Sequence, residues 1–374
     1  MHDTELNLDY FFSSSYEEAR KKFLNLSDKL GITIFSFQHP SITTESGDPL
    51  TIDASWLGPR DAKNVLVMLS GTHGPESYTG SAIQLSWLQQ QEKFISSSLA
   101  VLNIHGVNPY GWAFCSRTNE NNVDLNRNFV DFGYEIESHP LTKQIQEILS
   151  QSTKNGPNYI SITFGLIKSI LKNGLKSVSD SISNGQYICP EGIGYGGQTN
   201  QWSNKIVTKI LKENLIEAEQ VAIIDWHTGI GDYGKPCLLC FDDPSTLSYA
   251  RACSWWSKGV DKSNQSYVSG KRPDYQGLLI NSARDIALNY GATTTSAVIE
   301  FGTYGNLRML DALIIDRWLR SFKGHDIKDM NKSHKKKILD AFYPDDSSWR
   351  ASVLNHSHRI INEAIDGLNE QCDY

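Results

Sequence analysis

Short apolar runs recur along the chain, and they constrain its fold more than any other feature of the sequence. Three of the predicted strands, at Asn64–Leu69, Val221–His227 and Ser296–Phe301, are almost wholly apolar. A strand with one face in water alternates apolar and polar residues, whereas a strand covered by helices on both faces does not. Helical patterns lie between these strands. The sequence therefore predicts an α/β fold, a three-layer α/β/α sandwich with a mixed, mostly parallel, twisted sheet.

Hydrophobic periodicity and turn residues predict the other elements. An amphipathic helix is expected over Tyr10–Leu30, ended by Gly31. Further strands are expected at Ile32–Phe37, Leu50–Leu57, Leu99–Ile104 and Pro236–Phe241. Further helices are expected at Ser81–Gln91, Leu141–Ser150, Phe164–Leu175, Leu278–Tyr290, Leu310–Phe322 and Ala351–Leu368.

The chain divides into three predicted parts. Residues 1–60 supply an N-terminal helix and strands that lead into the sheet, and residues 61–322 form the main α/β domain. Within that domain, residues 151–200 are rich in Ser, Asn and Gly, and we interpret them as an insertion or flap. Residues 323–374 are polar and lysine-rich at first and then helical, which predicts a C-terminal helical appendix.

The composition is that of a globular protein. The chain has 374 residues, of which 39% are hydrophobic, and a formal net charge of -7. A mildly acidic chain gives no reason to expect a nucleic-acid partner or a membrane surface. The N-terminus lacks the features of a signal peptide, and no apolar window is long enough to span a bilayer. With scattered cysteines as well, we expect a cytoplasmic protein; its oligomeric state is open.

Two local patterns are set aside. The pair in Cys237-Leu-Leu-Cys240 lies inside an apolar strand-like run, so core packing is expected in place of a redox or zinc role. The segment Gly229–Gly234 matches a dinucleotide fingerprint, but another strand follows it. No helix N-terminus is therefore available to hold a pyrophosphate.

Four polar clusters follow strand-like runs, and ligands in such sheets bind beyond the carboxyl ends of the strands. The clusters contain His73 and Glu76; Arg117 to Phe129; Asp225 and His227; and Glu300. A catalytic zinc uses three nitrogen or oxygen ligands and keeps one position open, and His₂Glu is a known set. His73 and Glu76 could supply two of these ligands, since residues three apart in a helical turn share a face.

The third ligand is open at this point. His227 is the best placed of the remaining histidines and His105 is a weaker competitor, whereas the others, including His39, are expected to be solvated. By itself the segment from Ser70 to Ser77 could be a capped turn, with Glu76 favouring the helix dipole. A two-metal site, with Asp225 or His105 as an added ligand, is a further alternative. A role for Asp225 in orienting His227 is preferred.

Together these residues resemble the carboxypeptidase A-type zinc carboxypeptidase superfamily, including its aspartoacylase and succinylglutamate desuccinylase branch. Members of that superfamily carry His-x-x-Glu after a strand, here His73 and Glu76, and a distant third ligand, here His227. An arginine and an Asp-x-Asn-Arg motif lie between them, here Arg117 and Asp124–Arg127. A catalytic glutamate ends a late strand, which corresponds to Glu300.

The resemblance implies a role for each matched residue. His73, Glu76 and His227 would bind one Zn²⁺, and Glu300 would be the general base. Arg117 would stabilise the oxyanion, Asn126 and Arg127 would hold a substrate carboxylate, and Asp124 would orient His73. The family's mobile tyrosine corresponds to Tyr267 or Tyr275. The long spacing between Glu76 and His227 departs from the family and fits an insertion at 151–200.

The sequence thus predicts a zinc-dependent amide hydrolase of carboxypeptidase type, acting on a small molecule or peptide that bears a carboxylate. An aspartoacylase- or desuccinylase-like deacylase of an N-acyl amino acid is the first alternative. A non-catalytic protein that binds carboxylates is the second, although a pure binder has no need of both the ligand set and Glu300.

Overall fold

The computed structural model describes residues 8–91, 98–256, 275–321 and 328–370. Its centre is a seven-stranded sheet with the strand order β1-β2-β4-β3-β7-β9-β8. The bounds of these strands are β1 Thr33–Thr43, β2 Pro49–Leu57, β3 Asn64–Ser70, β4 Leu99–His105, β7 Gln220–Tyr233, β8 Pro236–Leu239 and β9 Thr293–Gly302.

The sheet is mixed. The four central strands β4, β3, β7 and β9 run parallel to one another, whereas β1, β2 and β8 pair antiparallel at the two edges. The central strands are buried along nearly their whole length, which explains their apolar sequences. The α/β fold class predicted from the sequence is confirmed.

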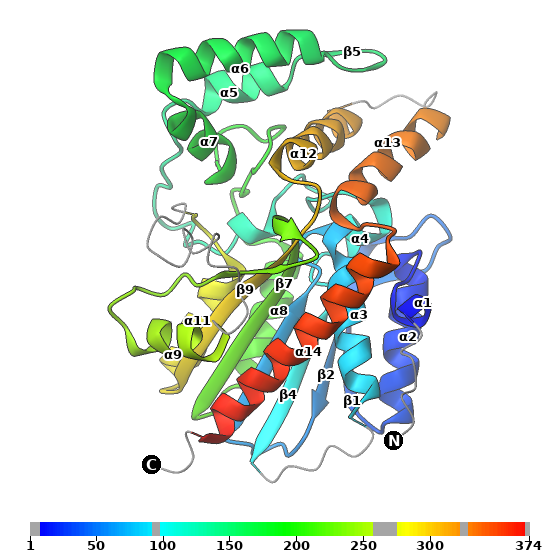
Figure 1. The fold of residues 1–374 in the computed structure, drawn as a ribbon, viewed down its shortest axis with the longest axis vertical. Coiled ribbons are helices and arrows are strands. Elements are labelled where there is room, and N and C mark those ends of the chain that lie inside the picture. Colours follow the sequence, from blue (N-terminus) through cyan, green and yellow to red (C-terminus); the bar gives the residue numbers. More distant parts are fainter. Residues whose placement is uncertain (1–7, 92–97, 257–274, 322–327, 371–374) are drawn as a thin grey trace.

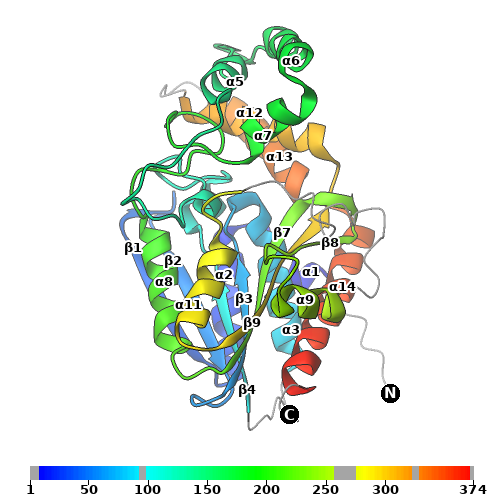
Figure 2. The same ribbon diagram turned by 90° about the vertical axis from the view of Figure 1, so that its left-hand side faces the viewer.

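Helices cover both faces of the sheet (Figures 1 and 2). One face packs against α2 (Tyr16–Lys29), α3 (Ser77–Gln89), α9 (Leu247–Trp256) and α14 (Ser347–Glu370). The other face packs against α8 (Trp202–Asn214) and α11 (Leu279–Asn289). Successive residues of β3 alternate between the two cores, with Leu66 in one and Val67 in the other.

The other helices lie near or beyond the carboxyl ends of the central strands, apart from α1. Their bounds are α1 Leu8–Phe11, α4 Pro109–Phe114, α5 Thr142–Leu149, α6 Tyr159–Asn173, α7 Leu175–Ser183, α12 Asn306–Ser321 and α13 Lys328–Phe342. Within residues 151–200, α6 and α7 follow the small hairpin of β5 (Ser152–Thr153) and β6 (Gly156–Pro157). They pack with α5 and α12 around a separate core that includes Ile145, Ile162 and Ile314.

The predicted elements differ from the structure in a few places. The single helix expected over Tyr10–Leu30 is two helices, because Ser15 caps a new one by accepting a hydrogen bond from the Glu18 amide at 3.2 Å. Helices α4, α7, α8, α9 and α13 were not predicted. Cys237 and Cys240 are buried in and just after β8, as the core-packing interpretation expects. No helix in the described ranges is both long and apolar enough to cross a membrane.

Trp349 anchors α14 to the end of β9. Its side chain is 1% exposed, and its indole N–H donates a hydrogen bond to the Gly302 carbonyl at 2.8 Å. We expect Trp349→Ala to lower the free energy of unfolding by about 3–5 kcal/mol, since it empties a large buried volume. Trp349→Phe should cost less, because it keeps most of the apolar contacts. Urea unfolding followed by circular dichroism measures both, with the exposed Leu307→Ala as control. Equal stability of Trp349→Ala and the control would contradict this role.

Candidate metal centre

The turn after β3 directs His73 and Glu76 to one point. Gly71 has a φ of 81°, a left-handed conformation that favours glycine, and it separates the strand from the short 3-10 helix Gly74–Glu76. His73 precedes that helix and Glu76 ends it. His73 Nδ1 therefore lies 3.0 Å from Glu76 Oε1, with both side chains buried.

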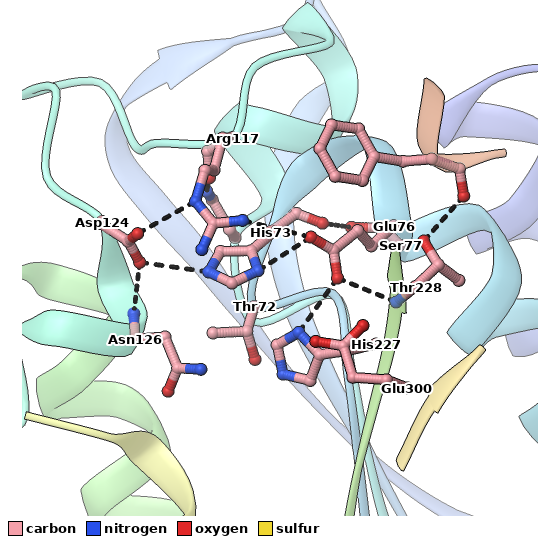
Figure 3. A network of polar contacts seen from close by, with 12 residues as sticks. Thr72, His73, Glu76, Ser77, Arg117, Asp124, Asn126, His227, Thr228 and Glu300 are labelled. Carbon is pink, nitrogen blue, oxygen red and sulfur yellow. Dashed lines mark hydrogen bonds and ion pairs between the residues drawn. The ribbon is translucent and has the colours of Figure 1, made fainter. Parts of the chain in front are cut away.

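The neighbouring strand β7 brings His227 to the same carboxylate (Figure 3). Since Ser70 pairs with Trp226, His227 lies one position beyond the end of β3. Its Nδ1 is 3.0 Å from Glu76 Oε2, and the Thr228 amide donates to the same oxygen at 3.0 Å. Among the described residues, His73, Glu76 and His227 form the one group with metal-ligand chemistry, with ligand atoms within 4.8 Å of one another.

These three side chains fit a zinc ion by donor type and by spacing. Two imidazoles and one carboxylate are a known zinc set. Ligands about 2.0–2.1 Å from a tetrahedral ion lie about 3.3 Å apart, close to the 3.0 Å contacts that Glu76 makes with each imidazole. A fourth position would face the pocket, which is lined by all three residues.

A carboxylate lies behind each imidazole. His73 Nε2 is 3.1 Å from Asp124 Oδ1, and His227 Nε2 is 2.9 Å from Asp225 Oδ2. The contact between His227 and Asp225 is as short as a hydrogen bond, but the two groups are not aligned for one. Neither atom makes a hydrogen bond with the described residues. Carboxylates in these positions fix ring orientation and raise ligand basicity at metal sites.

The charged groups of the site shift one another's pKa values. Burial raises the pKa of Glu76, but the imidazoles of His73 and His227 outweigh burial and hold that pKa well below its usual value. Burial opposes protonation of His227, yet Asp225 and Glu76 raise its pKa well above the usual value. Positive charge on His227 thus offsets part of the charge of the buried carboxylates. A divalent cation would replace that positive charge.

Glu300 is next to the three candidate ligands. It pairs with His227 in the parallel register of β7 and β9, so the sheet alone places the two side by side. Its carboxylate accepts a hydrogen bond from the Ile230 amide at 3.4 Å and lines the pocket. Burial and the charge of Glu76 raise the pKa of Glu300 to about 7.

Arg117 forms part of the wall of the pocket. Its Nε donates to Asp124 Oδ2 at 3.0 Å, and its Nη1 donates to Glu76 Oε1 at 3.4 Å. Asp316 of α12 accepts a hydrogen bond from the Arg117 amide at 2.9 Å and so fixes the backbone. The Nη2 group makes no hydrogen bond with a described residue, which leaves a donor for a bound molecule.

Asn126 and Arg127 line the same pocket. Asn126 Oδ1 accepts a hydrogen bond from the Leu279 amide at 2.9 Å, and its Nδ2 makes none with a described residue. Arg127 donates to the carbonyls of Asn126 and Ser183 and stacks on Tyr275 at 4.5 Å. None of the ion pairs in the described ranges involves Arg127, and its Nε is buried without a hydrogen bond. A cation held without a carboxylate partner suits an anionic ligand.

The rest of the lining is mainly apolar and comes from distant segments. It includes Ile182, Ile193, Ile230, Leu239, Phe241, Leu278, Val298, Met309, Leu313 and Phe342. The sequence did not identify Thr228 or Phe342 as pocket residues. Thr228 follows His227 directly, and its hydroxyl donates a hydrogen bond to the Phe342 carbonyl at 2.7 Å. Of the two candidate tyrosines, Tyr275 lines the pocket and Tyr267 lies outside the described residues.

Two other histidines are buried away from this site. His105 stacks on Phe23 at 4.2 Å and contacts Ser81 at 2.9 Å, and it is not part of the metal-ligand group of the described residues. Burial lowers its pKa to about 4. The expectation that His39 is solvated is wrong. His39 is 5% exposed and its ring packs against Trp202 at 4.9 Å, while its Nδ1 accepts hydrogen bonds from the Ser41 and Ile42 amides.

Comparison with known protein families shows which family the chain belongs to. A family model described as "Protein of unknown function (DUF2817)" matches residues 12–356. The chain belongs to this DUF2817 family. No curated protein matches the DUF2817 chain in sequence.

The DUF2817 chain is also similar to several solved structures. Carboxypeptidase A from Helicoverpa armigera is 12% identical with a TM-score of 0.49, over 95% of this chain and 75% of that one. Bovine thrombin-activatable fibrinolysis inhibitor, in complex with tick carboxypeptidase inhibitor, is 12% identical with a TM-score of 0.46, over 95% and 99%. A metallo-carboxypeptidase from Burkholderia cenocepacia is 11% identical with a TM-score of 0.42, over 95% and 70%. The fold class rests on the sheet topology described above.

Gly74 offers a test of how this turn holds the metal centre. A Cβ at Gly74 would lie 2.0 Å from the backbone carbonyl of Gly111, which cannot swing aside as a side chain could. We expect Gly74→Ala to displace His73 and Glu76 and to weaken Zn²⁺ binding by at least about 10-fold, as disturbed support of a ligand does. Chelator competition measures the affinity.

Gly133→Ala is the matched control, because a Cβ there would meet only the flexible carboxylate of Asp131 at 3.1 Å. His73→Ala removes a proposed ligand and should lower zinc affinity more than Gly74→Ala. Circular dichroism establishes that each variant is folded. Unchanged zinc affinity in His73→Ala would contradict the assignment of His73.

Proposed function

We propose that this protein is a zinc-dependent amide hydrolase of carboxypeptidase type. Its substrate would carry a carboxylate near the scissile amide, as a peptide C-terminus or an N-acyl amino acid does. The observation that carries this proposal is the convergence of His73, Glu76 and His227 on one point, with Glu300 directly beside them.

The zinc would be held by His73 Nδ1, a Glu76 carboxylate oxygen and His227 Nδ1, with Asp124 and Asp225 orienting the imidazoles. When bound, zinc acts as a Lewis acid and lowers the pKa of bound water towards about 7. A second ion is not part of the proposal, since Asp225 stands behind His227 and His105 is buried elsewhere.

Glu300 would take a proton from the attacking water and return it to the leaving amine. Its carboxylate lies in the pocket, and its one backbone hydrogen bond to Ile230 leaves the remaining lone pairs available. A carboxylate positioned in this way serves first as a general base and then as a general acid. Arg117 would donate a hydrogen bond to the developing oxyanion through its remaining guanidinium N–H groups.

Arg127 and Asn126 would hold the substrate carboxylate. The planar guanidinium can offer two parallel N–H donors to one carboxylate. Its contacts with backbone carbonyls and with Tyr275 fix its orientation without neutralising its charge. The apolar lining of the pocket would receive the adjoining hydrocarbon part of the substrate.

Replacing Glu300 by Gln tests the catalytic step. We expect Glu300→Gln to retain zinc and to lower kcat by about 10²–10⁴-fold, the usual contribution of general acid–base catalysis. Zinc content and turnover of a panel of C-terminal peptides and N-acyl amino acids measure the two effects. The exposed Glu147→Gln serves as control. Full activity of Glu300→Gln would contradict the assignment, and zinc and carboxylate binding without any wild-type turnover would favour the non-catalytic alternative.

Replacing Arg127 tests carboxylate recognition. Arg127→Ala should raise KM for substrates with a free carboxylate by about 10–100-fold, because it removes hydrogen bonds to a charged group. The same peptides with an amidated C-terminus should show little difference between wild type and variant. Arg127→Lys should restore part of the affinity but not the bidentate geometry. An equal loss on free and amidated peptides would contradict this role.

A further inference from the structure

Helix α6 exposes a row of large apolar side chains that no described residue covers. We call this row the apolar stripe: Ile160 is 85% exposed, Phe164 71%, Ile167 52% and Leu171 84%. Spacings of four, three and four residues place all of them along one side of a helix. The opposite side of α6 is the one that packs, since Ile162 and Ser169 are buried towards α5 and α7.

An apolar row of this kind is unusual on a free surface. Single exposed apolar residues are common, whereas contiguous apolar patches mark sites of interaction. The stripe is not an extension of the core, because the side of α6 that faces α5 and α7 has its own apolar residues. Both sides of α6 are thus apolar, and only one of them has a partner among the described residues.

The charges on the segment that carries the stripe have one sign, although Asp311 of α12 accepts a hydrogen bond from Tyr159 at the start of α6. Residues 151–179 contain Lys154, Lys168, Lys172 and Lys176 and no Asp or Glu, in a chain whose net charge is -7. Lys168 and Lys172 directly follow Ile167 and Leu171, so they flank the stripe. Both are exposed, and neither takes part in an ion pair of the described ranges, whereas Lys176 pairs with Asp180.

These charges distinguish between two kinds of occupant. A second copy of this chain would place α6 against α6, with lysines facing lysines and no carboxylate on either helix to neutralise them. An anionic lipid surface offers hydrocarbon for the stripe and phosphate or carboxylate groups for the lysines. Amphipathic helices with aromatic or aliphatic residues on one face and lysines beside them bind such surfaces.

The position of α6 permits this contact. α5, α6 and α7 lie at one end of the molecule (Figure 1), and the side chains of the stripe are exposed there. Ile182 and Ser183 at the end of α7 line the pocket of the metal centre, so this helix lies next to that site.

We propose that α6 docks this protein onto anionic lipid bilayers, with Ile160, Phe164, Ile167 and Leu171 in the interface and Lys168 and Lys172 on lipid headgroups. This goes beyond the proposed hydrolase activity and does not depend on it. The proposal differs from the expectation that the protein has no membrane partner. That expectation rested on the net charge and on the lack of a long apolar segment, and four apolar residues on one side of a helix change neither of these.

Flotation of the full-length protein with lipid vesicles tests the proposal. Wild type should float with vesicles of 70% phosphatidylcholine and 30% phosphatidylserine and much less with pure phosphatidylcholine. Binding should fall in 0.5 M NaCl, because salt screens exposed charges. We expect Phe164→Asp/Leu171→Asp to lower the partition coefficient at least about 10-fold, and Lys168→Glu/Lys172→Glu to lower it on the anionic vesicles.

Matched controls use sites far from α6. Leu247→Asp introduces the same charge at a residue that is 78% exposed on α9, and Lys205→Glu/Lys212→Glu reverses two exposed lysines of α8. Both should bind vesicles nearly as wild type does. Failure of wild type to float, or equal loss in the controls, would overturn the proposal. So would a dimer in light scattering that Phe164→Asp/Leu171→Asp converts to monomer without any change in vesicle binding.

Discussion

The carboxylate of Glu76 is the point at which separate segments of the chain meet. One oxygen lies 3.0 Å from His73 on the β3 turn, and the other lies 3.0 Å from His227 on β7. The Thr228 amide and Arg117 add further hydrogen bonds. A buried carboxylate requires compensation of this kind, since an isolated ionised group inside a protein is very costly. The arrangement of the whole site follows from satisfying this one group.

The sheet supplies the positions that this compensation requires. β3, β7 and β9 are neighbouring parallel strands, so their carboxyl ends deliver His73, His227 and Glu300 to one edge. Apolar packing on both faces holds these strands rigidly, with Leu66 and Val67 on opposite sides of β3. Helix α12 adds Asp316, which fixes the Arg117 backbone. Precise placement of ligands depends on such a rigid frame and on the groups that support each ligand.

The sequence predicted the parts that depend on local pattern. Continuous apolar runs predicted the central strands, and polar residues at their ends predicted the cluster of His73, Glu76, His227 and Glu300. Contacts between distant segments could not be predicted. Nothing local indicates that Tyr275 stacks on Arg127, that Phe342 reaches the pocket, or that His39 packs against Trp202. Burial is set by tertiary packing, so the outward orientation of the stripe on α6 was likewise not predictable.

The central claim is that one zinc ion is held by His73, Glu76 and His227. Anomalous diffraction from crystals grown with zinc, measured on both sides of the zinc absorption edge, tests it most directly. The account predicts one strong peak per chain, bounded by His73 Nδ1, the Glu76 carboxylate and His227 Nδ1. A peak elsewhere, a second equal peak beside Asp225, or no peak between these three side chains would contradict it.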